Sequence, residues 1–468
     1  MELARWNWKD MVQDMGGQVR IGAGSGFWGD ALDPAVELLE RGDLDYMSMD
    51  YLAELTMALL QRQKLKDPRK GYIPDLPSHM RALLPLAKAS GTRLVCNGGG
   101  ANPRAAAERI RELARELGLD GMRIAVVEGD DLLGALDDLL GSGAVFENMD
   151  TGESNLAGIR NRIVAANAYT DSSAIQAALA EGADVVIAGR VSDNALYVGP
   201  IMHEFGWRYE DAYADRIAAA ITIGHVVECA AATTGGMSSR FDEMPDMGRV
   251  GFPIVEFDAD GTAVVTKLEG TGGRVDTFTV KEHLTYEIGD PKQYLMPDGI
   301  ADFTTVRIEE VGKDRVRLSN MTGHPRPERL KLVIGYEDGW IGEGMLFFPW
   351  PHALERAEKA RETLLQRFER LGLEADQMHF DLVGVDMLHG PASPRPDYDP
   401  SEVGLRVAVH TEDRDEAEKV RRACSQLWIM GPGGTSFGTP QKARPVFGLW
   451  PTLVSRDAVR QTIDILEA

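Results

Sequence analysis

Cysteine is scarce in this chain of 468 residues. Only three cysteines are present, Cys96, Cys229 and Cys424, and no two of them form a Cys-x-x-Cys pair. A sparse, odd-numbered set is typical of a reducing compartment. A chain of this length buries most of its apolar surface without disulfide bonds.

Long apolar runs are absent as well. No run approaches the ~20 residues that a membrane span requires. The segment from Met1 to Gln18 carries Arg5, Lys9 and Asp10 and has no apolar core. We therefore expect no signal peptide, no membrane partner and a cytoplasmic protein.

Basic residues are outnumbered by acidic ones. The 50 Lys and Arg residues face 73 Asp and Glu residues, which gives a net charge of −23. This balance argues against nucleic acid and against anionic membranes as partners. A local basic pocket for a phosphate or carboxylate stays compatible with it.

Metal and nucleotide motifs are also missing. The nine histidines show no zinc-binding spacing, so the sequence predicts no structural zinc. No Gly-Lys-Ser or Gly-Lys-Thr follows a glycine-rich turn, which excludes a Walker loop. Mg²⁺ bound through scattered carboxylates is not excluded, and the sequence leaves the cofactor unknown.

The first part of the chain alternates short apolar runs with helical patterns. This alternation predicts an α/β fold, a mostly parallel, doubly wound sheet domain over residues 18–250. A long Ala-rich helix is expected at Asp211–Ala232. The expected strands are Val19–Gly22, Leu44–Met49, Arg93–Cys96, Arg123–Val127, Arg162–Ala165 and Asp184–Ala188.

The remainder predicts two further units. Residues 251–340 read as a β-rich unit with strands at Val264–Thr266, Thr277–Val280, Phe303–Ile308 and Val316–Leu318. Residues 341–468 follow the order β-α-β-β-α-β of a ferredoxin-like α+β unit. Its expected strands include Phe380–Asp386, Gly404–His410 and Pro445–Leu449, and a closing helix is expected at Asp457–Leu466.

Several ordered stretches resemble the acyclic terpene utilisation (AtuA-like) family. They are Val19–Asp30, Leu44–Glu54, Val185–Asp193, Glu228–Gly236 and Lys267–Gly273. The resemblance covers roughly residues 18–350. It implies a role in bacterial catabolism of branched acyclic compounds or related carboxylic acids, and it names no reaction.

The chain departs from the family at one point. Some long members carry a further small carboxy-terminal domain with a His-Ala-Arg-Ser-Gly-Asp-Lys-Gly-like motif, which this sequence lacks. A separate small protein is one possible source of that domain, and a different mode of action is the other.

Polar and glycine-rich loops follow three of the expected strands, and such loops converge on one edge of a parallel sheet. They predict a pocket for a carboxylate or an acyl-CoA. The spacing Gly22-x-Gly24-x-Gly26 differs from the dinucleotide motif, so NAD is not favoured. The loop residues are Gly24, Ser25 and Gly26, then Asn97 and Gly98, then Arg190 and Asp193.

Each of these residues has a plainer interpretation. The glycines suit tight turns as well as an anion cradle. A buried Arg190 must be paired or bind an anion, and Asp193 could be its salt-bridge partner or a helix cap. Asp171 stands at another strand-to-helix junction, where it could transfer protons or cap a helix.

The end of the Ala-rich helix supplies the candidate proton-transfer group. Glu228 lies in an apolar setting that raises a carboxyl pKa, and His225 shares its face of the helix. A simple surface pair is the alternative. Cys229 is a possible nucleophile or a small core residue. Thr234, Gly235 and Gly272 are expected to close the pocket and contact substrate.

These residues favour an enzyme acting on a branched acyclic carboxylic acid or its CoA thioester, of the lyase or hydratase type. An amide or thioester hydrolase is the alternative within enzymes. A non-catalytic subunit of a catabolic complex is the alternative outside them. The 8 tryptophans, 14 phenylalanines and 19 methionines supply apolar candidates for a homo-oligomer interface.

Overall fold

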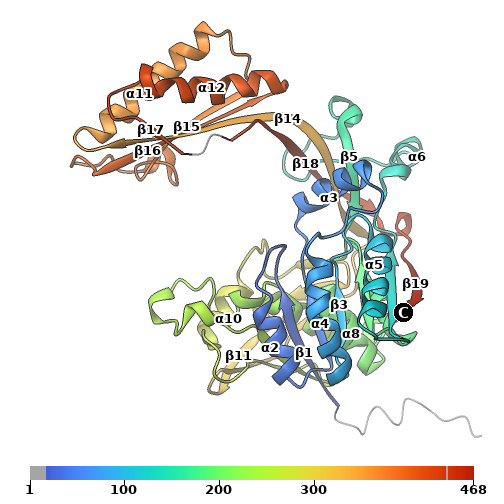
Figure 1. The fold of residues 1–468 in the computed structure, drawn as a ribbon. Coiled ribbons are helices and arrows are strands. Elements are labelled where there is room, and N and C mark those ends of the chain that lie inside the picture. Colours follow the sequence, from blue (N-terminus) through green and yellow to red (C-terminus); the bar gives the residue numbers. More distant parts are fainter. Residues whose placement is uncertain (1–16, 439–440) are drawn as a thin grey trace, which may run out of the picture. The chain divides into compact units, whose positions relative to one another are not determined.

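The computed structural model describes residues 17–438 and 441–468 (Figure 1). The expectation about a signal peptide falls on residues 1–16 and lies outside the described residues. The chain forms two compact units. The large unit runs to Gly158 and includes Val164–Gly335 and Leu449–Ala468, and the small unit comprises Ile159–Ile163 and Tyr336–Gly448.

A ten-stranded sheet organises the large unit, in the order β11-β12-β8-β7-β1-β2-β3-β6-β4-β19. Its five central strands are parallel and almost fully buried, as expected for apolar runs covered on both faces. They are β1 (Gln18–Ser25), β2 (Tyr46–Met49), β3 (Arg93–Cys96), β6 (Val185–Ala188) and β4 (Arg123–Glu128).

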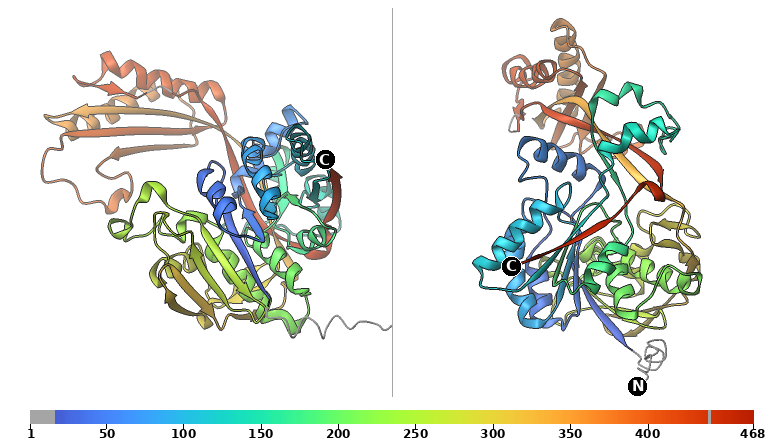
Figure 2. Two further views of the ribbon diagram at one scale, coloured as in Figure 1. Left: turned by 60° about the horizontal axis from the view of Figure 1, so that its bottom comes forward. Right: turned by 90° about the vertical axis from the view of Figure 1, so that its right-hand side faces the viewer.

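Helices cover both faces of this sheet (Figure 2). Connections that step from β1 to β2, β3 and β4 run in one direction, and right-handed crossovers put their helices on one face. The connection from β4 to β6 runs in the opposite direction along the sheet, and the helices from α7 onward therefore cover the other face. The first layer is α2 (Asp33–Arg41), α4 (Leu76–Ser90) and α5 (Pro103–Glu116); the second is α7 (Ser173–Ala180), α8 (Ala195–Phe205) and α9 (Ala214–Val227).

Antiparallel strands extend the sheet on both sides. Part of the expected β-rich segment 251–340 joins this sheet, because its strand β7 (Pro253–Asp258) pairs directly with β1. The other added strands are β8 (Ala263–Lys267), β12 (Arg315–Ser319), β11 (Arg307–Gly312) and β19 (Thr462–Glu467). A separate small sheet holds β9 (Tyr294–Met296), β10 (Gly299–Asp302) and β13 (Thr322–His324).

Two expected strands of this segment are wrong. Thr277–Leu284 is the helix α10, because Asp276 accepts hydrogen bonds from the backbone N–H groups of Phe278 and Thr279 and so caps a helix. This cap outweighs the β-branched residues that suggested a strand. Phe303–Thr305 is a short 3₁₀ turn, and the strand β11 begins only at Arg307.

The expected strand Arg162–Ala165 is not part of the parallel sheet. The observed strand β5 (Ile163–Ala168) pairs with β14 instead. The expected helix Asp211–Ala232 is interrupted: α9 ends at Val227, and a 3₁₀ turn covers Ala230–Ala232. Ala230 has a φ of +46°, which breaks the helix path for a residue with a side chain.

The expected closing helix Asp457–Leu466 is also wrong. β19 pairs antiparallel with β4, with Ile463 opposite Val127 and Ile465 opposite Ala125. The alternation of Ile463, Asp464 and Ile465 has the period of a strand with one covered face. A partner strand more than 300 residues earlier in the chain decides this structure.

The small unit has a four-strand core covered by two helices. β15 pairs antiparallel with β16, so the expected strands Phe380–Asp386 and Gly404–His410 share one sheet. Its assignment to the ferredoxin-like fold stays a prediction. The elements are β14 (Arg329–Pro349), α11 (Ala353–Arg370), β15 (Gln377–Val383), β16 (Glu402–Thr411), α12 (Arg414–Met430), β17 (Ser436–Phe437) and β18 (Arg444–Ser455).

The helices α3 (Glu54–Lys66) and α6 (Leu136–Gly141) also belong to the large unit. No helix among residues 17–438 and 441–468 combines the length and the apolar character needed to cross a membrane.

Candidate functional site

The candidate site lies where the loops after β3 and β6 separate. The chain leaves β3 toward α5 on one face of the sheet and leaves β6 toward α8 on the other. Ligands of doubly wound sheets bind in the crevice that such a divergence opens beyond the carboxyl ends of the strands. Asn97 follows β3 and Arg190 follows β6. The two loops touch, since the Gly99 N–H donates to the Ala188 carbonyl at 3.1 Å.

Asn97 joins the loops after three neighbouring strands. It is fully buried, and its side-chain oxygen accepts a hydrogen bond from the Tyr51 N–H at 2.8 Å. Its amide donates to Asp50, whose carboxylate also accepts from the Leu52 N–H at 3.1 Å. The Asp50 N–H donates to the Ser25 carbonyl at 3.0 Å. The ends of β1, β2 and β3 are therefore fixed relative to one another.

Arg190 is buried, with 1% of its surface exposed. It forms an ion pair with Asp193, and it donates to the carbonyls of Val191 at 2.8 Å and Leu52 at 3.0 Å. Its guanidinium carbon lies 4.3 Å from the centre of the Tyr169 ring. Such a charge is tolerated because every side of it is paired. The salt-bridge interpretation therefore describes Arg190, and an anionic ligand would have to compete with Asp193.

Asp193 is the more accessible member of the pair, with 34% of its side chain exposed. Burial raises the pKa of its carboxyl, and the guanidinium of Arg190 opposes the rise because the ion pair favours the charged form. The negative charge of Asp193 adds to burial in raising the pKa of Asp50 well above its usual range.

Glu228 stands at the carboxy-terminal end of α9, and only 12% of its side chain is exposed. Burial raises the pKa of its carboxyl well above the usual range, and the negative charges of Asp193 and Glu287 raise it further. Arg190 acts in the opposite direction and is outweighed. Burial and like charge thus favour the protonated form of Glu228, whereas the ion pair with Arg190 favours the ionised form of Asp193.

His225 and Tyr294 form the wall behind Glu228. The Nδ1 atom of His225 lies 3.6 Å from the Glu228 Oε1 atom and 3.1 Å from the Tyr294 hydroxyl. Burial lowers the pKa of His225 to about 4, so its ring is neutral. The sequence placed His225 and Glu228 on one helix face, as the (i, i+3) spacing requires. Tyr294 and Asp50 were not expected here, although Asp50 directly follows a strand of the parallel sheet.

The glycine-rich stretch at the end of β1 is closely packed, and β1 runs to Ser25, so Gly24 and Ser25 belong to the strand and not to the expected loop. The Gly26 N–H donates to the Asp30 carboxylate at 2.8 Å, so it is not free for a ligand. A Cβ atom on Gly26 would lie 2.8 Å from the Cys229 Cα atom, and one on Gly24 would lie 2.8 Å from the Met49 Cγ atom. Close packing therefore accounts for both glycines without an anion. Ser25 is buried and donates to a carbonyl two residues ahead.

Gly98, Thr234, Gly235 and Gly272 likewise contact protein groups. A Cβ atom on Gly98 would lie 3.0 Å from the Leu76 side chain. The Thr234 hydroxyl lies 2.6 Å from the Gly251 carbonyl, and the Gly272 N–H donates to the Arg249 carbonyl at 2.7 Å. Thr234 and Gly272 thus both contact the segment 245–251. The contacts of these four residues give no sign of a shared substrate surface with Arg190.

Asp171 belongs to a different polar cluster. Its Oδ2 atom accepts hydrogen bonds from Arg456 at 2.6 Å and Arg326 at 3.0 Å, and Gln461 donates to its Oδ1 atom at 2.8 Å. Ser173 donates to the same Oδ1 atom. The carboxylate therefore anchors the segment before β19 to the start of α7. It faces these arginines rather than Glu228, because the strand β5 that precedes it is not part of the parallel sheet.

Cys229 is a poor nucleophile in this setting. Burial raises the pKa of its thiol, and the carboxyl groups of Glu228, Asp50 and Asp193 raise it further, because negative charge opposes formation of a thiolate. Cys96 is also buried, and burial raises the pKa of its thiol to about 12. Neither thiol is activated in the way that nucleophilic catalysis requires.

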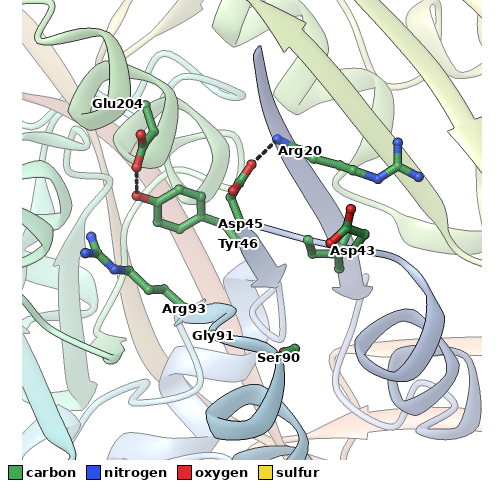
Figure 3. A pocket seen from close by; sticks show the side chains of 9 residues that line it. Arg20, Asp43, Asp45, Tyr46, Ser90, Gly91, Arg93 and Glu204 are labelled. Atoms are coloured by element: carbon green, nitrogen blue, oxygen red, sulfur yellow. Dashed lines mark hydrogen bonds between the residues drawn. The ribbon is translucent and has the colours of Figure 1, made fainter. Parts of the chain in front are cut away.

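A polar cavity of about 420 Å³ lies at the opposite edge of the sheet, by the amino ends of β1, β2 and β3. Figure 3 shows Arg20, Arg93, Tyr46 and Glu204 around it. The Tyr46 hydroxyl bonds Glu204, Arg93 contacts His203 at 3.2 Å, and Arg20 pairs with Glu256 outside the cavity. Its charges are thus largely satisfied. The carboxyl edge, which holds Asp193 and Glu228, is the stronger candidate on chemical grounds.

No group of three or more His, Cys, Asp or Glu side chains among residues 17–438 and 441–468 is arranged to hold a metal ion.

Comparison with known proteins gives a match to one family model. The model of the family described as "Acyclic terpene utilisation family protein AtuA" matches residues 19–465. No curated protein and no solved structure matches the chain. Because the match covers both compact units almost from end to end, the chain belongs to the acyclic terpene utilisation family AtuA, which gives it a catabolic role.

Proposed function

We propose that the protein is an enzyme of the lyase or hydratase type that acts on a branched acyclic carboxylic acid or its CoA thioester. The observation that carries this proposal is a pair of carboxyl groups in different surroundings. The ion pair with Arg190 favours the ionised form of Asp193, while burial and neighbouring negative charge raise the pKa of Glu228 and favour its protonated form. Two carboxyl groups whose surroundings separate their pKa values are suited to a base role and an acid role.

The pair supports the addition of water to a carbon–carbon double bond conjugated with the acyl carbonyl. Asp193 accepts a proton from water, and the hydroxyl oxygen bonds to the β-carbon. Glu228 gives its proton to the α-carbon. The proton held by Asp193 then returns through solvent to Glu228, so that one water is consumed and both groups are restored. The reverse sequence eliminates water from a β-hydroxy acyl group.

Hydrolysis of an amide or thioester is the rival reaction. It needs an activated nucleophile, and the raised pKa of the Cys229 thiol argues against that residue. A hydrolase of a CoA ester also releases a free thiol, whereas a hydratase does not. The two reactions therefore leave different products from one substrate.

The test uses branched α,β-unsaturated acyl-CoA esters in D₂O, with mass spectrometry and a thiol-specific dye. We expect the acyl chain to gain one water and one carbon-bound deuterium without release of CoA. Glu228→Gln should lower turnover at least 100-fold and leave binding within about 3-fold, because general acid catalysis contributes roughly 10²–10⁴-fold. Asp171→Asn is the matched control in the second carboxylate cluster. Release of CoA with no deuterium uptake would replace the proposal with a hydrolase.

A further inference from the structure

The Nδ1 atom of His225 is placed between two hydrogen-bonding groups. It lies 3.1 Å from the Tyr294 hydroxyl and 3.6 Å from the Glu228 Oε1 atom. A neutral imidazole carries a proton on one nitrogen and a single lone pair on the other. The nitrogen that carries the lone pair accepts one hydrogen bond at a time, so the tautomer of His225 decides what Glu228 can do.

The surroundings of the ring favour a proton on Nε2. No described residue lies within hydrogen-bond geometry of Nε2, so no donor occupies that nitrogen. A proton on Nε2 leaves the lone pair on Nδ1, where Tyr294 and Glu228 are the two donors available.

The ring has no freedom to leave this place. His225 is 1% exposed, and its ring packs on those of His283 at 5.7 Å, Tyr294 at 4.8 Å and Phe303 at 5.3 Å between centroids. These three rings therefore fix the direction of the Nδ1 lone pair. Because burial lowers the pKa of His225 to about 4, this lone pair is present throughout the neutral range.

We propose that His225 is the positioning residue of the site, and that its Nδ1 atom accepts the carboxyl proton of Glu228 when Glu228 is protonated and the Tyr294 hydroxyl proton when it is not. This inference deepens the proposed function and rests on it for the role of Glu228. It adds an exchange of hydrogen-bond partners that keeps the acid oriented before proton transfer and satisfies the histidine afterwards.

The charged groups that act on Glu228 come from several segments of the chain. None of these charged groups is changed in the His225 and Tyr294 variants below. The ionisable groups around Glu228 and His225 are Asp193, Arg190, Glu287, Cys229, Tyr197, Tyr286, Tyr294 and His283. A hydrogen bond from the neutral carboxyl to Nδ1 favours the neutral form, so its loss should lower the pH at which Glu228 ionises.

The first test measures the tautomer of the substrate-free protein labelled with ¹⁵N-histidine. Two-bond ¹H–¹⁵N spectra at pH 7 should show a neutral His225 with its proton on Nε2. The resonance is assigned by its loss in His225→Asn. A proton on Nδ1 would overturn the proposal, because Nδ1 would then donate and could not accept the Glu228 proton.

The second test follows the carboxylic acid band of Glu228 by infrared spectroscopy as the pH rises, and Glu228→Gln identifies the band. In His225→Leu the band should move to the frequency of a free acid and vanish about one pH unit lower. His225→Asn, whose amide oxygen can take the place of Nδ1, should restore most of the shift. His203→Asn is the control, since His203 contacts Arg93 at the opposite edge of the sheet.

An unchanged band in His225→Leu would overturn the proposal. If His225→Leu fails to fold, Tyr294→Phe gives the decisive result, because removal of the competing hydroxyl should lower the frequency of the Glu228 band. No change in that variant would count against the exchange of partners. Neither test needs substrate, so failure of the hydration assay with the expected spectra would reject the proposed reaction alone.

Discussion

Removal of the buried charge of Arg190 tests the physical account of the site most directly. In Arg190→Met a side chain of similar length replaces the guanidinium, so apolar packing is largely kept. The carbonyls of Val191 and Leu52 lose their donors, and Asp193 loses its partner. Breaking a buried ion pair by removing one member costs roughly 3–5 kcal/mol.

The exposure of Asp193 sets the expected value within that range. Because 34% of its side chain is exposed, water solvates part of the abandoned charge, and we expect the lower end, about 3 kcal/mol. This is a large share of the 5–15 kcal/mol that typically separates folded from unfolded domains. With an m-value of about 3 kcal/mol/M, the urea midpoint should fall by roughly 1 M.

The assay follows unfolding of the large unit by hydrogen exchange of peptides that cover β3 and β6, because a chain with two compact units need not unfold in one step. Arg190→Lys keeps the charge and should lose only about 1–2 kcal/mol. Asp193→Asn combined with Arg190→Met should cost less than the sum of the two single changes, since the pair is coupled. A midpoint within about 0.2 M of the wild type in Arg190→Met would refute the reasoning.

Three further predictions follow from individual contacts. Gly26→Ala should destabilise the protein by about 1–3 kcal/mol in urea unfolding, because its Cβ atom would meet the Cys229 backbone, whereas Gly141→Ala, with open space around it, should be neutral or slightly stabilising. Burial raises the pKa of Asp130 to about 6, so stability should fall by roughly 3 kcal/mol as the pH rises from about 4 to 6, and Asp130→Asn should abolish that slope in pH-dependent unfolding. The Cys229 thiol should react with iodoacetamide at pH 7 at least 10-fold more slowly than in the urea-unfolded chain, as measured by peptide mass spectrometry; equal rates would contradict its raised pKa.

The sequence alone determined the features that depend on local pattern. The apolar runs at Arg93–Cys96 and Val185–Ala188 predicted two parallel strands, because strands buried on both faces read as continuous apolar segments. The (i, i+3) spacing placed His225 beside Glu228. The ordered motifs also indicated the family that the match over residues 19–465 shows.

Only the tertiary structure decided the features that depend on distant partners. Thr462–Glu467 became a strand because β4 offered an unpaired edge, a contact that no local pattern contains. Asp171 lies outside the candidate site because it forms ion pairs with Arg326 and Arg456. The protonation of Glu228 likewise depends on charges that the fold brings from other segments, since electrostatic energy follows distance in space and not separation along the chain.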